Sequence, residues 1–202
     1  MERAELVSLV RATGCAEERG DVFFLCDPAW REREMGRIAG KAGPERDGWL
    51  AVPTGGTSGG VRFARHDERT LAAAVWGFCE HFRLEQVNAV DVLPAYHVSG
   101  LMARVRCAMT GGEYVAWNWK RLEAGGRPEL RGGALWVISL VPTQLQRLLA
   151  VPEALTWLRG FAVIFVGGGP VWPELAEAAA RAELRISLSY GMTETAAMVT
   201  AS

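Results

Sequence analysis

The sequence has few histidines and cysteines and almost no net charge. Three histidines and four cysteines occur among 202 residues, and the formal net charge is −1. Basic and acidic residues are mixed along the chain, so no basic patch predicts binding to nucleic acid or to an anionic membrane. The cysteines lie far apart with no Cys-x-x-Cys pair, which excludes the usual spacing of a structural zinc site. These absences favour a small molecule as the ligand.

Long hydrophobic runs are also missing. No segment approaches the roughly 20 consecutive apolar residues that a membrane-spanning helix needs, and the first residues, Met-Glu-Arg-Ala-Glu, are too polar for a signal peptide. Half of the residues are nevertheless hydrophobic, which is enough for a substantial core. We therefore expect a cytoplasmic protein with reduced cysteines, folded as one domain or two small ones.

Glycine, by contrast, is concentrated in one stretch. Residues 54–62 have the sequence Thr-Gly-Gly-Thr-Ser-Gly-Gly-Val-Arg. Because such a loop has few side chains, its backbone N–H groups can approach an anion closely, and the hydroxyls of Thr54, Thr57 and Ser58 add further donors. The stretch is a candidate phosphate loop, but it is not a Walker motif, which ends in Gly-Lys-Ser/Thr. A flexible surface turn is the alternative, since glycine and serine also dominate ordinary turns.

The apolar pattern predicts alternating strands and helices. Apolar runs predict strands at residues 21–26, 49–52, 89–93, 114–117, 134–141, 161–166 and 185–189. Helical spacing, proline starts and charge predict helices at residues 2–12, 30–38, 67–82, 98–109, 142–149 and 173–183. Repeated strand, loop and helix units with continuous apolar strands are typical of an α/β fold, with a mostly parallel sheet covered by helices.

The glycine-rich and polar motifs all follow predicted strands. In parallel sheets, ligands bind outside the carboxyl ends of the strands, so these motifs would meet in one composite site. The order predicted around the glycine loop is strand, loop and helix, with Asp67 capping that helix. The motifs concerned are residues 54–62, 96–100, 167–169 and 190–195.

Two ionisable residues in these motifs each allow two interpretations. His97 is either a hydrogen-bonded structural residue or a donor to a carboxylate at the mouth of an acyl pocket. Glu194 is either a solvated or helix-capping carboxylate or, beside a phosphate loop, an oxygen ligand for Mg²⁺. Thr193 next to it can donate to a phosphate oxygen.

Glycines 167–169 and Tyr190 also allow two interpretations. The three glycines form either a simple strand-to-helix turn or a slot in which a planar ring such as adenine lies against the backbone. Tyr190 is either a stacking wall of that slot or a core residue at a strand end.

The motifs resemble those of the adenylate-forming acyl-CoA synthetase superfamily. Residues 54–62 are similar to its phosphate loop, and residues 190–195, Tyr-Gly-Met-Thr-Glu-Thr, match its Tyr-Gly-x-Thr-Glu signature. Residues 93–101, 139–147 and 167–170 are similar to the branch that joins o-succinylbenzoate to CoA in menaquinone or phylloquinone biosynthesis. The fold implied is the core of the large N-terminal domain of these enzymes.

The resemblance implies a two-step reaction that uses ATP, Mg²⁺ and CoA. The acid's carboxylate attacks the α-phosphorus of ATP to give an acyl-adenylate and pyrophosphate, and CoA thiolate then displaces AMP. The catalytic residues implied are Thr193, Glu194, His97 and Arg62, with Glu194 as the metal ligand. Those implied to hold the nucleotide are Thr54, Gly55, Gly56, Thr57, Ser58, Gly59, Arg62, Gly167, Gly168, Gly169, Tyr190, Gly191, Met192 and Thr193. Those implied to border the acid are His97, Ser99, Gly100 and Gly169.

The chain departs from the family pattern in two places. Where the family loop ends in Pro-Lys-Gly, residues 61–63 are Val-Arg-Phe, so an arginine that can fork onto phosphate replaces the lysine. The sequence stops at Ser202, shortly after the signature. We therefore expect residues 1–202 to form a partial N-terminal domain, with its motif-bearing core at residues 49–202 and without the C-terminal lid domain. A non-catalytic nucleotide- or acyl-binding module and an adenylating enzyme for another acid stay open, as does a homodimer.

Overall fold

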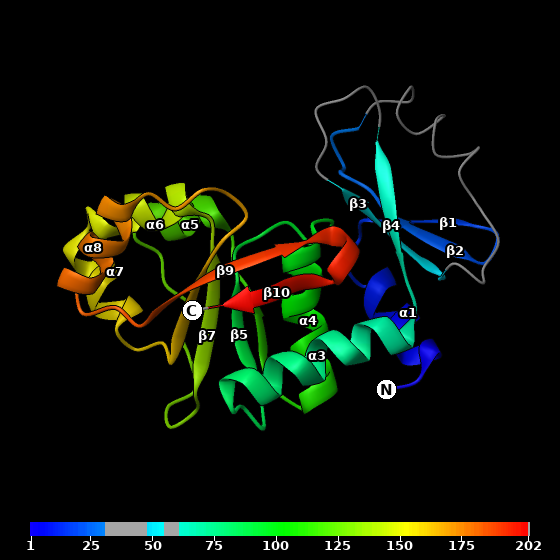
Figure 1. The fold of residues 1–202 in the computed structure, drawn as a ribbon, viewed down its shortest axis with the longest axis horizontal. Helices are drawn as coiled ribbons and strands as arrows, with labels where there is room; N and C mark the ends of the chain where they lie inside the picture. The colour runs from blue at the N-terminus through cyan, green and yellow to red at the C-terminus, as the bar shows by residue number, and fades with distance from the viewer. Residues whose placement is uncertain (31–47, 55–60, 202) are drawn as a thin grey trace.

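The computed structural model describes residues 1–30, 48–54 and 61–201. In this part of the chain, the strands form one sheet of six and one sheet of four (Figure 1). The helix predicted after Trp30 and the glycine-rich residues 55–60 lie outside the described residues.

The large sheet is parallel except at one edge. Its strand order is β10-β9-β8-β7-β5-β6, and β10 runs antiparallel to β9. Its strands are β5 (Asn88–Asp91), β6 (Tyr114–Ala116), β7 (Trp136–Leu140), β8 (Val163–Val166), β9 (Ile186–Met192) and β10 (Ala197–Ala201). This arrangement confirms the predicted α/β fold with a mostly parallel sheet.

Helices cover both faces of this sheet, because successive residues of the central strands are apolar on either side. Val137 of β7 and Phe165 of β8 pack in one core with helices α3 (Glu68–Phe82) and α4 (Val98–Thr110). Their neighbours Ile138 and Ile164 pack in a second core, on the opposite face. The helices of that second core are α5 (Trp119–Glu123), α6 (Pro142–Leu149), α7 (Pro152–Leu158) and α8 (Pro173–Arg181) (Figure 1). Burial on both faces explains the continuous apolar runs in the sequence.

Helix α3 begins at the predicted cap. The Asp67 carboxylate accepts a hydrogen bond from the backbone N–H of Thr70 at 2.8 Å, and the backbone N–H of Asp67 donates to the Thr70 hydroxyl at 2.9 Å. Leu71, Val75 and Phe78 follow at helical spacing and are buried. Both the cap and the apolar face of this helix are therefore confirmed.

The small sheet carries the glycine loop. Its strand order is β1-β2-β3-β4, with β2 and β3 parallel and the other pairs antiparallel. Its strands are β1 (Ala16–Arg19), β2 (Val22–Leu25), β3 (Leu50–Thr54) and β4 (Arg62–His66). The predicted order of strand, loop and helix is wrong here, because β4 lies between the loop and α3. The glycine-rich residues therefore connect two antiparallel strands of a separate sheet.

Sequence reasoning missed β4 because charged residues interrupt its apolar pattern. Arg62, Arg65 and His66 leave only two apolar positions in a strand of five residues. Helices α5 and α7 were missed because they are only five and seven residues long, too short for a hydrophobic period to stand out. Among the described helices, none is long and apolar enough to cross a bilayer.

One hydrophobic core joins the two sheets. Leu50 and Val52 of β3 pack in the same cluster as Leu101 of α4 and as Leu6 of helix α1 (Arg3–Arg11). The other face of the small sheet forms a smaller cluster that includes Phe24 and Ala51. The glycine loop is thus carried by a sheet that is anchored on the α3–α4 side of the large sheet.

Candidate functional site

The Tyr-Gly-Met-Thr-Glu-Thr signature forms a tight reversal between two strands. Strand β9 runs through its first three residues, a 3₁₀ turn (η2, Thr193–Thr195) follows, and β10 returns antiparallel (Figure 1). A Cβ atom on Gly191 would lie 1.8 Å from the carbonyl oxygen of Ala197, so the close pairing of these strands requires glycine. Ala196 and Ala197 have φ angles of 53° and 85°, which are uncommon for residues other than glycine. The backbone of the signature is therefore tightly constrained.

Thr193 joins this turn to the small sheet. Its hydroxyl donates to the carbonyl oxygen of Pro53 in β3 at 3.3 Å, and its own carbonyl oxygen accepts from Nε2 of His66 in β4 at 2.8 Å. His66 and Thr193 are both buried. Since Thr54 follows Pro53 and Glu194 follows Thr193, the backbone at the start of the glycine loop and the backbone of the signature lie side by side. Two motifs far apart in the sequence are therefore neighbours in the fold.

Glu194 is exposed, and no hydrogen bond or ion pair joins its carboxylate to another described residue. No group of three or more acidic, histidine or cysteine side chains suited to a metal occurs within the described ranges. A lone carboxylate nevertheless fits Mg²⁺, which keeps several waters and binds through one or two carboxylates together with substrate phosphates. The metal-binding role of Glu194 stays a prediction with which this geometry is compatible.

The ends of the predicted phosphate loop are the part that the structure describes. Thr54 ends β3 and Arg62 begins β4, and the two are partners in the antiparallel register. The loop is therefore closed at its base, next to the contact between Pro53 and Thr193. The predicted nucleotide ligands Gly55, Gly56, Thr57, Ser58 and Gly59 lie outside the described residues.

Glycines 167–169 and Tyr190 lie close together at the ends of β8 and β9. The Ser189 hydroxyl donates to the carbonyl oxygen of Val166 at 3.4 Å, and the glycines and Tyr190 begin at the next residue of each strand. The last two glycines are exposed, and Tyr190 is 61% exposed. This exposure excludes the core interpretation of Tyr190 and leaves its ring available as one wall of a slot.

His97 is the residue before the first turn of α4, and its side chain is exposed. Its ring lies 4.6 Å from the ring of Tyr96. None of the hydrogen bonds or ring contacts between described residues joins His97 to the signature turn. A place for His97 beside the acid therefore stays a prediction.

Gly100 has a structural explanation of its own. A Cβ atom there would lie 2.5 Å from the carbonyl oxygen of Pro94, so the close packing of α4 on the preceding loop requires glycine. Ser99 next to it is partly buried. Neither residue lines the cavity described next.

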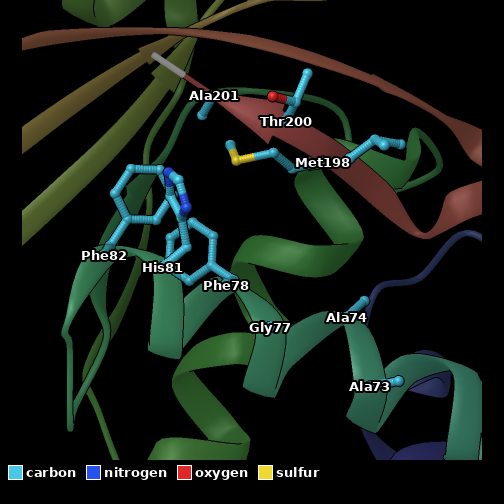
Figure 2. A pocket seen from close by; sticks show the side chains of 10 residues that line it. Ala73, Ala74, Gly77, Phe78, His81, Phe82, Met198, Thr200 and Ala201 are labelled. Atoms are coloured by element: carbon cyan, nitrogen blue, oxygen red, sulfur yellow. The ribbon is translucent and has the colours of Figure 1, made fainter.

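A cavity of about 270 Å³ opens between α3 and β10 (Figure 2). Phe78, His81 and Phe82 line it from α3, and Met198 and Thr200 line it from β10, directly after the signature turn. Aromatic and apolar walls with a few polar groups are typical of small-molecule sites. Sequence reasoning missed this site because the two phenylalanines fit the spacing of an ordinary core helix.

A buried arginine lies against one wall of this cavity. The guanidinium carbon of Arg106 is 4.0 Å from the centroid of the Phe78 ring, and Arg106 is 5% exposed. Burial lowers the pKa of Arg106 to about 10. Its Nε atom has no hydrogen-bond partner, and no carboxylate of the described residues pairs with it. A buried cation without a counter-ion is unfavourable. Arg106 is therefore a candidate partner for an anionic group, and it reaches the cavity only through its contact with Phe78, since it is not among the residues that line it.

Comparison with known proteins agrees with this geometry. A family model described as AMP-binding enzyme matches residues 19–202. The chain is 29% identical over 180 residues to a probable 2-succinylbenzoate–CoA ligase of Mycobacterium tuberculosis (strain CDC 1551 / Oshkosh), and the match covers 87% of this chain and 46% of that protein. The chain therefore spans about half the length of this curated relative.

Solved structures are similar over about three quarters of the chain. E. coli MenE with a bound m-phenylether-linked analogue of OSB-AMS has a TM-score of 0.59 at 28% identity, covering 76% of this chain and 32% of that one. The O-succinylbenzoate coenzyme A synthetase of Bacillus subtilis in complex with ATP and magnesium ion has a TM-score of 0.63 at 24% identity, with the same coverage, and this likeness concerns the fold. Because the family model matches all but the first 18 residues, the chain belongs to the AMP-binding enzyme family.

Proposed function

We propose that this protein is an AMP-forming acid–CoA ligase and that its acid is o-succinylbenzoate. The names of the M. tuberculosis relative and of the E. coli structure, which are 29% and 28% identical, support this choice of acid. The substrates would be the acid, ATP and CoA, with Mg²⁺ as the metal. Residues 1–202 would supply the part of the site that binds the nucleotide and the acid.

The observation that carries the proposal is the contact between Thr193 and Pro53. The hydroxyl of Thr193 lies 3.3 Å from the Pro53 carbonyl oxygen, so the signature carboxylate and the glycine loop can act on the same ligand. A nucleoside triphosphate suits the glycine loop and Glu194 together. The N–H and hydroxyl donors of the loop would bind its phosphates, and Glu194 would hold the Mg²⁺ that balances their negative charge.

In the first step, the acid's carboxylate attacks the α-phosphorus of ATP and pyrophosphate leaves. Thr54 and Arg62, at the ends of the loop, would hold the β- and γ-phosphates, and Tyr190 would cover the adenine. Glu194 would hold Mg²⁺, which when bound neutralises charge on the phosphates. Fixed donors aimed at developing charge lower the barrier of such a transfer. In the second step, the CoA thiolate attacks the acyl carbon and AMP leaves.

The cavity between α3 and β10 supports an aromatic acid with two carboxylates. The rings of Phe78 and Phe82 suit a benzene ring. The second carboxylate of o-succinylbenzoate would balance the charge of Arg106, which a monocarboxylic acid would leave unpaired. The reacting carboxylate would then point toward the signature turn, which precedes the β10 wall of the cavity.

Pyrophosphate exchange with ATP and o-succinylbenzoate tests the first step. We expect Glu194→Gln and Arg62→Ala to lower the exchange rate on the order of 100-fold, because each removes a group aimed at transition-state charge. Both side chains are exposed, so the melting temperature should stay close to that of the wild type. Glu85→Gln is a matched control, since Glu85 is exposed and precedes the amino end of β5. Normal exchange in Glu194→Gln would contradict the metal assignment.

Substitution of Arg106 tests the choice of acid. We expect Arg106→Met to raise the KM for o-succinylbenzoate about 10-fold or more while the KM for ATP changes little, since a charge-assisted bond contributes about 1.5–3 kcal/mol. The melting temperature should not fall, because the variant removes a desolvated cation without a counter-ion. An unchanged KM for the acid would exclude Arg106 from the acid site.

A further inference from the structure

His66 is a buried histidine whose hydrogen bond reaches the backbone of the signature. It is 2% exposed and ends β4, the strand that follows the glycine loop. Its Nε2 atom lies 2.8 Å from the carbonyl oxygen of Thr193. A carbonyl oxygen only accepts, so Nε2 carries the proton and donates. The other ring nitrogen, Nδ1, is buried without a hydrogen-bond partner.

The carbonyl group that His66 contacts belongs to the peptide unit joining Thr193 to Glu194. Because a peptide unit is planar, a hydrogen bond to this oxygen fixes the orientation of the plane from which the Glu194 side chain departs. The same oxygen accepts the backbone N–H of Ala196 at 3.1 Å, which closes the 3₁₀ turn. His66 therefore donates to the same carbonyl oxygen whose hydrogen bond from Ala196 closes the turn.

The opposite side of Thr193 is held by the partner strand of the same hairpin. Its hydroxyl donates to the carbonyl oxygen of Pro53, and Pro53 pairs with Phe63 in the β3–β4 register. One hairpin thus contacts the residue before Glu194 at two atoms and also carries both ends of the glycine loop. The strained backbone at Ala196 and Ala197, with φ of 53° and 85°, is consistent with a turn held in place by its surroundings.

We propose that His66 is a positioning residue, which sets the Glu194 carboxylate relative to Thr54 and Arg62, the ends of the glycine loop, so that these groups can engage one Mg²⁺-bound triphosphate. This inference rests on the proposed function, because it takes Glu194 as the metal ligand. His66 does not touch the nucleotide in this proposal. It acts through the Thr193 carbonyl group, as outer-shell partners do when they orient a metal ligand.

Calorimetric titration with ATP, in the presence and absence of Mg²⁺, measures the effect without relying on turnover. The quantity to compare is the factor by which Mg²⁺ tightens ATP binding. We expect His66→Met to lower this factor about 10-fold to 100-fold, the usual effect of losing an outer-shell partner. The affinity for ATP without Mg²⁺ should change little, because the substitution leaves the residues of the glycine loop unchanged.

His66→Gln supplies the conservative rescue. The amide nitrogen of glutamine can reach the position of the histidine Nε2 and donate to the Thr193 carbonyl oxygen, so we expect the Mg²⁺ factor to return to within about 3-fold of the wild type, a difference of less than 1 kcal/mol. His66→Asn is polar but too short to reach, and it should behave like His66→Met. If His66→Met does not fold, the comparison of glutamine with asparagine decides the question alone. Equal Mg²⁺ factors in the glutamine and asparagine variants would overturn the proposal.

Glu194→Gln separates this inference from the proposed function. If wild-type protein binds ATP with no Mg²⁺ enhancement, or if Glu194→Gln retains the enhancement, the metal assignment fails and the inference fails with it. If Glu194→Gln loses the enhancement while His66→Met keeps it, the positioning role of His66 alone is overturned. Loss in both variants with rescue by glutamine supports it.

Discussion

The large and small sheets hold their parts of the candidate site in different ways. The large sheet lies between two layers of helices, and its β8 and β9 strands end in the exposed glycines and in the signature turn. The small sheet has one face in the main core, and its other face forms a cluster with four buried residues among those that the structure describes. Its hairpin β3–β4 carries the glycine loop. A sheet covered by helices on both faces thus carries the signature, and a hairpin of a second sheet carries the phosphate loop.

This difference shows why Thr193 is central to the site. A site divided between two sheets keeps its geometry only if the sheets are fixed to each other, and residues at a site must be held within fractions of an ångström to act together. The shared hydrophobic core holds the two sheets against each other, but apolar packing alone does not set the positions of individual polar atoms at the site. The two hydrogen bonds at Thr193, to Pro53 and from His66, fix them at the site itself.

The largest effect is expected from the core of the large sheet. Phe165 of β8 packs against Phe78 and Phe82 of α3, with ring centroids 5.2 Å and 4.8 Å away. Phe165→Ala should lower the free energy of unfolding by about 3–5 kcal/mol, the usual cost of emptying such a buried volume. Urea denaturation measures this, and it should show a single transition. A loss below 1 kcal/mol would mean that this side of the sheet is not the main core.

Phe24 of β2 makes the matching test in the small sheet. It packs against Phe63 at 5.1 Å in the smaller cluster. Phe24→Ala should cost about 3 kcal/mol, the low end for this substitution, because its cluster is small within the described part of the chain. Amide exchange should accelerate in β2 and β3 but not in β7 and β8. Equal acceleration in both sheets would show that they unfold as one unit.

Asp91 gives the large sheet a pH dependence. Burial raises the pKa of Asp91 to about 6, and hydrogen bonds from the Leu93 N–H and the Tyr114 hydroxyl oppose this rise. The unfolded chain has an Asp pKa of about 3.9, so the folded state holds this proton more tightly. Its contribution to stability is present below pH 4 and is lost as the pH rises to about 6. The loss is about 3 kcal/mol at most, at about 1.4 kcal/mol for each pKa unit.

Asp91→Asn stays neutral and should remove this decline. Melting temperatures from pH 4 to pH 7, compared with the wild type, measure the effect. Asp21→Asn is the control, because Asp21 is exposed beside β2 and should leave the wild-type profile unchanged. If Asp91→Asn shows the same decline as the wild type, another group is responsible.

The smallest effect is expected at the cap of α3, the helix that follows the small sheet and packs on the large one. Asp67→Ala should cost about 1 kcal/mol, and Asp67→Ser should restore most of it. The backbone N–H of Thr70 lowers the pKa of Asp67, so the cap stabilises α3 at neutral pH and weakens as the pH falls through that lowered value. Thermal melts of the three proteins at pH 7 and pH 3 test both statements. Equal stability of Asp67→Ala and wild type at pH 7 would show that the cap contributes nothing.

Sequence patterns predicted every strand of the large sheet except β10, and they missed β1 and β4 of the small sheet. Strands such as β7 and β8 are buried on both faces, so their sequences are apolar throughout and easy to recognise. Strand β4 lies at the edge of the small sheet as far as residues 1–30, 48–54 and 61–201 show, and it carries Arg62, Arg65 and His66. Its place comes from antiparallel pairing with β3, which local composition does not reveal. Because β4 was missed, the glycine loop was predicted to lead directly into helix α3.

The candidate site was predicted in its parts but not in its assembly. The glycine loop and the signature were recognisable because glycine, hydroxyl and carboxylate side chains at those spacings suit phosphate and metal. The cavity wall of Phe78 and Phe82 was hidden, since helical spacing marks a core face and a pocket face alike. Arg106 was hidden because its burial depends on the packing of α4 against α3, which no local pattern encodes.

The sequence by itself determined the α/β class, the cap of α3 and the two motifs that identify the family. These features depend on local chemistry, namely side-chain polarity, backbone freedom and periodicity, and all of these are present in the order of residues. Only the tertiary structure decided that the glycine loop belongs to a second sheet and that Thr193 meets both Pro53 and His66. Such contacts depend on how two sheets share one core, because residues more than a hundred positions apart become neighbours only when the chain packs.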